Sequence, residues 1–176
     1  KKVYSVSPLI SIITLNYNQA SVTVDFLEYD KKLHYKNFEI LVCDMASAED
    51  VTKIIHPEKY PNTRLLLSNK NLGFAGGNNW GMRQAKGDFF FIVNNDTEMT
   101  EYLLDNLLKP FTEDRSIGVT SPKIMYYHHP DTIQYAGFFP MNKYTGRTTI
   151  RGESEKDIGQ YDISGPTSGS HGCAML

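Results

Sequence analysis

One carboxylate and two amide side chains follow an apolar run of this sequence at a place where chemistry could occur. Asp96 comes three residues after the run 89–93, and Asn94 and Asn95 lie between them. A Mg²⁺ or Mn²⁺ ion bound together with a diphosphate needs only one or two protein carboxylates, because phosphate oxygens and water complete its shell. Asp96 is therefore the best metal candidate in the chain. The alternative is that it stabilises the start of the next helix.

Three other apolar runs also end in polar residues. They are 9–15, which leads to Asn16; 38–43, which leads to Asp44; and 64–68, which leads to Asn69 and Asn71. If these runs are parallel strands, their ends meet at one edge of the sheet, where open α/β sheets bind ligands. Each end alone is ordinary, and Asp44 could simply cap a turn. Four such ends together predict a site.

A glycine-rich loop at residues 73–79 lies between two of these runs. Its spacing, G-x-x-G-G, matches neither the dinucleotide fingerprint nor the P-loop. Its backbone N–H groups could bind an anion at the start of a helix. The glycines could equally serve a tight turn and close helix packing. The loop alone is weak evidence for a site.

The elements that position these residues alternate along the chain. Strands are expected to start near residues 9, 38, 64, 89 and 117, and helices are expected over 21–33, 48–55, 77–85 and 101–108. This repeat requires crossover connections, so we expect an α/β fold with a mainly parallel sheet and helices on both faces, in three α/β/α layers. The last helix is expected to end near Pro110, and hairpins and loops are expected after Pro122.

Composition narrows the classes of function. The 176 residues, of which 40% are hydrophobic, carry a net charge of −2, so they suit one globular domain and indicate no nucleic-acid surface. The apolar runs are too short to span a bilayer. Cys43 and Cys173 provide neither a disulfide framework nor metal spacing, which favours a reducing, cytoplasmic location. The sequence does not begin with Met and stops at Leu176 within an apolar run, so we expect a fragment.

Four motifs in this order resemble family 2 glycosyltransferases of the GT-A fold. They are I-S-I-I-T-L-N-Y-N, E-I-L-V-C-D-M-A-S, N-L-G-F-A-G-G-N-N and A-K-G-D-F-F-F-I-V-N-N-D-T. They are most similar to the rhamnosyltransferase-like branch, and the match runs with gaps from Leu9 to Leu176. R-G-E-S-E-K-D-I-G-Q-Y-D and the closing G-C-A-M-L are similar to later landmarks of that branch. Four ordered motifs are far more specific than any one of them.

The resemblance implies a nucleotide-sugar site. The implied binding residues are Thr14, Asn16, Asp44, Ser47, Asn71, Gly73, Asn78, Asn79, Asn94 and Asn95. Among them, Thr14 and Asn16 are expected to line the base pocket, and Asp44 is expected to hydrogen-bond the base. Asn94-Asn95-Asp96 occupies the D-x-D position, where Asp96 would bind the divalent cation and Asn95 would face the ribose. Cys43 and Met45 depart from the V-D-N that is common in the second motif.

The resemblance also implies an activity. The expected enzyme transfers a sugar from a UDP- or dTDP-sugar to a saccharide or lipid-linked acceptor, with Mg²⁺ or Mn²⁺ and with inversion, in cell-surface polysaccharide synthesis. Residues 1–122 would form the donor-binding half, and 123–176 the start of the acceptor side, within one structural domain. The general base would lie beyond Leu176, so we expect this fragment to be inactive alone.

Two other functions are alternatives to a glycosyltransferase. One is a non-catalytic nucleotide- or carbohydrate-binding module that keeps the GT-A fold. The other, a Rossmann-type oxidoreductase, is disfavoured because no strand is followed by the required glycine spacing. Peripheral association of the full-length protein with the inner face of the membrane is left open.

Overall fold

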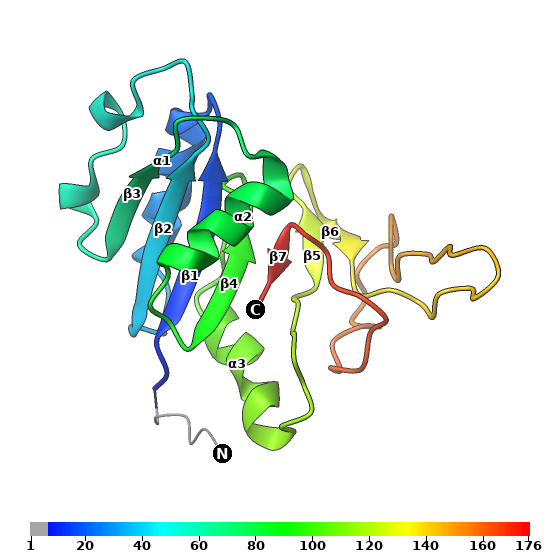
Figure 1. Cartoon of the computed structure of the whole chain (residues 1–176). Helices are drawn as coiled ribbons and strands as arrows, with labels where there is room; N and C mark the ends of the chain where they lie inside the picture. Colours follow the sequence, from blue (N-terminus) through cyan, green and yellow to red (C-terminus); the bar gives the residue numbers. More distant parts are fainter. Residues whose placement is uncertain (1–6) are drawn as a thin grey trace.

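The computed structural model describes residues 7–176, and its centre is a five-stranded sheet (Figure 1). The strand order is β3-β2-β1-β4-β7. The strands are β1 (Ile10–Asn16), β2 (Phe38–Asp44), β3 (Thr63–Leu67), β4 (Phe89–Val93) and β7 (Ala174–Met175). The first four are parallel, whereas β7 pairs antiparallel with β4. The predicted mainly parallel sheet is confirmed.

Helices cover both faces of the sheet, as the sequence predicts. On one face, α1 (Ala20–Asp30) and α3 (Leu103–Glu113) bury Phe26, Leu104 and Leu107 against the strands. On the other face, α2 (Gly73–Gln84) packs Trp80 against a second apolar cluster of β1 and β2. Because both faces of the sheet are covered, its strands read as continuous apolar runs rather than as alternating patterns.

Two glycines bring α2 close to the sheet. A Cβ at Gly77 would lie 2.8 Å from the sulfur of Met45, and one at Gly81 would lie 2.7 Å from Cγ2 of Ile13 and 2.9 Å from the sulfur of Cys43. Burial in this contact raises the pKa of the Cys43 thiol to about 12, so the thiol stays protonated and inert. The structure thus supports the packing role of these two glycines.

Some predicted helices differ from the observed ones. Residues 48–55 form no α-helix but contain the 3₁₀ turn η1 (Val51–Lys53), and η2 (Pro57–Lys59) follows, because so short a segment before a proline cannot propagate an α-helix. Helix α2 begins at Gly73 rather than near Gly77. Helix α3 does not end near Pro110 but continues to Glu113. Phe111, beyond the proline, packs on the core, and this burial outweighs the hydrogen bond that Pro110 cannot donate.

The predicted fifth parallel strand at 117–120 is wrong. These residues form no strand, although Thr120 exchanges two backbone hydrogen bonds with Leu176. The fifth strand of the sheet is instead β7, from the far end of the chain. The predicted hairpin after Pro122 is present as β5 (Ile124–Tyr126) paired with β6 (His129–Tyr135). No helix within residues 7–176 has the length and apolar character needed to cross a membrane.

Candidate functional site

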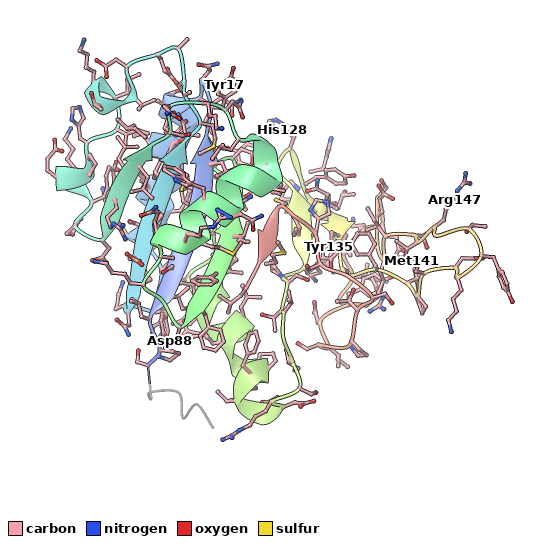
Figure 2. All side chains as sticks on the ribbon, in the orientation of Figure 1. Tyr17, Asp88, His128, Tyr135, Met141 and Arg147 are labelled. Atoms are coloured by element: carbon pink, nitrogen blue, oxygen red, sulfur yellow. The ribbon has the colours of Figure 1, made fainter. Side chains whose placement is uncertain are left out.

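The carboxyl ends of the parallel strands meet at one edge of the sheet, as predicted. Asn16 at the end of β1 lies opposite Asp44 at the end of β2. A pocket of about 290 Å³ opens at this edge, and Figure 2 shows Tyr17 there at the top of the sheet. The pocket is lined by Leu15, Tyr17, Gln19, Met45, Asn71, Gly73, Phe74, Asn78, Val93, Asn94 and Asn95. One wall therefore comes from the glycine-rich loop and another from the end of β4.

Directly associated with the pocket is a buried chain of polar side chains that joins three strand ends. Ser47 donates a hydrogen bond of 2.5 Å to Oδ1 of Asp44, and Nδ2 of Asn16 donates one of 2.8 Å to the same oxygen. Thr23 of α1 then donates to Oδ1 of Asn16 at 2.8 Å, and Nδ2 of Asn95 donates to the Thr23 hydroxyl at 2.9 Å. Each strand end is thus tied to its neighbours.

Asp44 is held by internal donors. Only 4% of the residue is exposed, and its second oxygen accepts a hydrogen bond of 3.0 Å from the backbone N–H of Ser47. A buried carboxylate needs such donors, because an unpaired charge away from water is costly. The carboxylate of Asp44 therefore accepts three hydrogen bonds, which fix the network at the end of β2.

The glycine-rich loop forms the start of α2. Gly73 has φ +67°, a left-handed conformation that L side chains rarely adopt, and its N–H donates to the Asn71 side chain at 2.8 Å. A Cβ at Gly73 would meet no atom within 4 Å, so this residue leaves the pocket open. One turn later, Asn78 is fixed by a hydrogen bond of 3.0 Å from Nδ2 to the carbonyl of Phe74.

Asp96 is exposed and directly follows Asn95, which lines the pocket, although Asp96 itself is not one of the lining residues. Its carboxylate forms no hydrogen bond or ion pair with any residue of the 7–176 range, so its oxygens are open to a ligand. The neighbouring thiol of Cys173 lies 3.4 Å from Oγ1 of Thr97. Burial raises the pKa of Cys173, and the negative charge of Asp96 adds to the rise. The thiol is therefore protonated at neutral pH and is a poor metal ligand.

The donor set at Asp96 fits one kind of cation site. Within the part of the chain that the structure describes, no group of three or more His, Cys, Asp or Glu residues could hold a metal. A closed protein cage is therefore absent from residues 7–176. One open carboxylate instead suits a hard divalent cation whose other ligands are diphosphate oxygens and water.

The predicted binding residues fall into three groups. Those that line the pocket are Asn71, Gly73, Asn78, Asn94 and Asn95. Those in the buried network are Asn16, Asp44 and Ser47, together with Asn95. Thr14 is fully buried away from the pocket, and its Oγ1 has no hydrogen-bond partner within residues 7–176, whereas Asn79 is exposed on α2 outside the pocket lining. Their ligand contacts stay predictions.

Sequence reasoning missed several contributors. Tyr17 and Phe74 line the pocket and are about half exposed, at 51% and 52%. Both lie inside the motifs that carry the family resemblance. Their positions, directly after a strand end and directly after a glycine, could have predicted that they line the site. Thr23 gave no signal, because a threonine within a helix is ordinary and only the fold brings it to Asn95.

Comparison with known proteins identifies the family. A sequence model of glycosyl transferase family 2 matches residues 11–171. The chain belongs to this family. Among similar proteins is the glycosyltransferase GlyG of Streptococcus pneumoniae, 29% identical over 61% of this chain and 36% of its own length. Another is the Escherichia coli UDP-Glc:alpha-D-GlcNAc-diphosphoundecaprenol beta-1,3-glucosyltransferase WfaP, 32% identical over 50% of this chain and 35% of its own length.

A third relative matches a larger share of this chain. The amylovoran biosynthesis glycosyltransferase AmsB of Erwinia amylovora is 26% identical over 73% of this chain and 43% of its own length. The chain thus spans 35% to 43% of these three relatives.

The solved structures establish the fold. The mannosyltransferase PcManGT of Pyrobaculum calidifontis, in complex with GDP-Man and Mn²⁺, superposes with a TM-score of 0.62 at 23% identity, over 72% of this chain and 40% of its own. TarS 1-349 of S. aureus with UDP-GlcNAc gives 0.52 at 21% identity, over 68% and 41%. The predicted GT-A fold is confirmed.

Proposed function

We propose that this chain is the donor-binding part of a glycosyltransferase that uses a nucleoside-diphosphate sugar. The observation that carries the proposal is the pocket at the carboxyl edge of the sheet, with the open carboxylate of Asp96 directly after its lining residue Asn95. Both occupy the place where open α/β sheets bind nucleotides. Family membership supports the reaction class, and a non-catalytic module is the alternative that a transfer assay on the full-length protein would separate.

The pocket walls suit a nucleotide. Tyr17 and Phe74 are aromatic, half exposed and on two different walls, so either could stack on a base. Asn71 and Asn94 supply amide groups for ribose, diphosphate or sugar oxygens, and Asn95 supplies an amide for a ligand group that can donate a hydrogen bond. We propose UDP or dTDP as the nucleotide. The name of WfaP, with UDP-Glc as donor, supports the first.

Asp96 would hold a Mg²⁺ or Mn²⁺ ion together with the donor diphosphate. When bound, such an ion supplies positive charge that stabilises the diphosphate leaving group. The chain's own part is to present one hard oxygen ligand directly after Asn95, which lines the pocket. The Mn²⁺ in the PcManGT complex supports this proposal.

Several finer features of the reaction are also proposals. We propose an inverting transfer to a saccharide or lipid-linked acceptor in cell-surface polysaccharide synthesis, at the cytoplasmic face of the membrane, with rhamnose among the candidate sugars. The diphosphoundecaprenol acceptor in the name of WfaP supports the lipid-linked class. Residues 1–122, of which 1–6 lie outside the described residues, would form the donor half, and 123–176 the start of the acceptor side.

Calorimetric titration with a panel of nucleotides tests the proposed function. UDP, dTDP and GDP are added separately to the protein in buffer with MnCl₂. We expect one of them to bind with a micromolar Kd, and the strongest binder identifies the base. If none of the three binds at millimolar concentration, the proposal is wrong.

A further inference from the structure

Thr23 links the ends of β1 and β4 through two side-chain hydrogen bonds. It lies on α1, is 0% exposed, and contacts Asn16 at 2.8 Å on one side and Asn95 at 2.9 Å on the other. Asn16 is also 0% exposed and Asn95 is 8% exposed. Each polar atom in this chain must therefore find its partner inside the protein or in the pocket.

The direction of these hydrogen bonds starts at Asp44. Both of its oxygens accept hydrogen bonds, Oδ1 from Asn16 and Ser47 and Oδ2 from the backbone of Ser47, so Asn16 turns its amide N–H toward Asp44 and its carbonyl oxygen toward Thr23. The single hydroxyl proton of Thr23 then goes to an acceptor, either Oδ1 of Asn16 or, at 3.3 Å, the carbonyl of Gln19. In both cases the Thr23 oxygen is left to accept, and within residues 7–176 the side chain that donates to it is Asn95, through Nδ2.

The orientation of Asn95 follows from this order. With Nδ2 turned inward, Oδ1 of Asn95 points the other way. It accepts no hydrogen bond from residues 7–176, and it is not among the buried atoms without a partner, so it is open at the pocket that Asn95 lines. A ligand group that hydrogen-bonds to this acceptor oxygen must therefore be a donor.

We propose that Thr23 is a positioning residue that turns the acceptor oxygen of Asn95 toward the donor nucleotide, through a one-way chain anchored on Asp44. The ligand group that meets Asn95 must then be a hydrogen-bond donor: a ribose hydroxyl or the imide N–H of uracil or thymine. The inference deepens the proposed donor-binding function and depends on it for the ligand, but the hydrogen-bond order stands on the contacts alone.

Isosteric variants of Thr23 test the role. Thr23→Val keeps the shape and removes the hydroxyl, whereas Thr23→Ser keeps the hydroxyl. The matched control is Thr63→Val, because Oγ1 of Thr63 is buried without a partner within residues 7–176 and lies at the start of β3, at the opposite edge of the sheet. With UDP and MnCl₂ in calorimetry, we expect Thr23→Val to weaken binding about tenfold, the factor of one hydrogen bond, and the other two to stay within about threefold.

Analogues that lack one donor give a readout that a merely structural role would not move. The probes are 2′-deoxy-UDP, 3′-deoxy-UDP and N3-methyl-UDP, each compared with UDP. We expect wild-type protein to bind one of them at least about tenfold more weakly than UDP, and Thr23→Val to lose that discrimination. Equal discrimination in wild type and Thr23→Val would overturn the proposal.

A measurement without ligand separates this proposal from the proposed function. In NMR spectra of the free protein, the side-chain amide protons of Asn95 should exchange with solvent more slowly than those of exposed Asn79. Thr23→Val should abolish the difference, and Thr23→Ser should keep it. If UDP does not bind but this pattern holds, only the proposed function fails. If the Asn95 protons exchange as fast as those of Asn79 in wild type, the proposed role of Thr23 is wrong, whether or not Thr23→Val folds.

Discussion

At the scale of residues, burial decides what the polar groups of this protein can do. The side chains from Ser47 to Asn95 are joined by hydrogen bonds and are largely buried, so they can hold fixed orientations in the site. Some buried polar side chains among residues 7–176 lack such partners, and two of them lead to stability predictions. They are Asp30 at the end of α1 and Thr14 in β1.

Replacement of Asp30 should make the protein more stable at neutral pH. Only 8% of the residue is exposed, and burial raises its pKa to about 6 from 3.8, against the opposing charge of Lys31. The folded state therefore binds this proton more tightly than the unfolded chain, and that stabilising contribution is lost as the pH rises from 4 to about 6. Asp30→Asn avoids the loss, so we expect its free energy of unfolding at pH 7.5 to be roughly 2 kcal/mol higher than that of wild type.

Urea unfolding of Asp30→Asn and wild type at pH 7.5 and at pH 3.5 checks this sign. The difference should be present at the higher pH and become small at the lower one, where Asp30 is protonated in the folded state and mostly protonated in the unfolded chain. A variant that is less stable than wild type at pH 7.5 would show that the carboxylate makes a favourable contact instead.

Thr14→Val should also stabilise the fold. The hydroxyl of Thr14 is fully buried and has no hydrogen-bond partner within the described residues, so removing it relieves a desolvation penalty of about 1 kcal/mol or more. Valine keeps the shape and suits a strand. Urea unfolding of the free protein measures the change. A clear loss of stability would mean that the hydroxyl is hydrogen-bonded.

At the scale of elements, helix α2 combines packing with access to the pocket. Its first residue, Gly73, opens the pocket, and Gly77 and Gly81, four residues apart, let the helix lie close to β1 and β2. The loop before the helix can reach the site only while the helix keeps this distance.

Gly81→Ala should therefore destabilise the protein, although alanine favours helices by about 1 kcal/mol over glycine. The new Cβ would lie 2.7 Å from Ile13 and 2.9 Å from Cys43, and relieving such overlap in a packed core costs roughly 1–3 kcal/mol. Thermal unfolding should show a lower Tm for Gly81→Ala and an unchanged or higher Tm for Asn79→Ala, an exposed position of the same helix. A higher Tm for Gly81→Ala would contradict the close packing.

The elements that the sequence predicts well are those whose signal is local. The strands β1 to β4 read as apolar runs, and α1 carries apolar residues at helical spacing. The fifth strand could not be predicted in this way, because β7 has two residues and exists only by pairing with β4. The continuation of α3 past Pro110 depends on the burial of Phe111, which is a tertiary effect. The same holds for the site. Asp96 could be predicted because it closely follows an apolar strand, whereas the contact of Thr23 with Asn95 depends on the folded structure.

At the scale of the whole molecule, the parallel topology explains why one edge carries the site. Strands β1 to β4 are all parallel, so residues distant in sequence, such as Asn16 and Asn95, lie at the same edge of the sheet. The hairpin of β5 and β6 and the loops after it lie on the β7 side of the sheet (Figure 1). This placement leaves the pocket and Asp96 together at the carboxyl edge.

If Asp96 and this pocket bind a nucleoside diphosphate together with a divalent cation, the cation should strengthen nucleotide binding, which titration of UDP with and without Mn²⁺ measures. Wild-type protein is compared with Asp96→Asn and with Glu101→Gln, which removes one exposed negative charge at the start of the following helix. We predict that Mn²⁺ strengthens UDP binding at least about tenfold in wild type and Glu101→Gln, but not in Asp96→Asn. Equal strengthening by Mn²⁺ in Asp96→Asn would contradict the account.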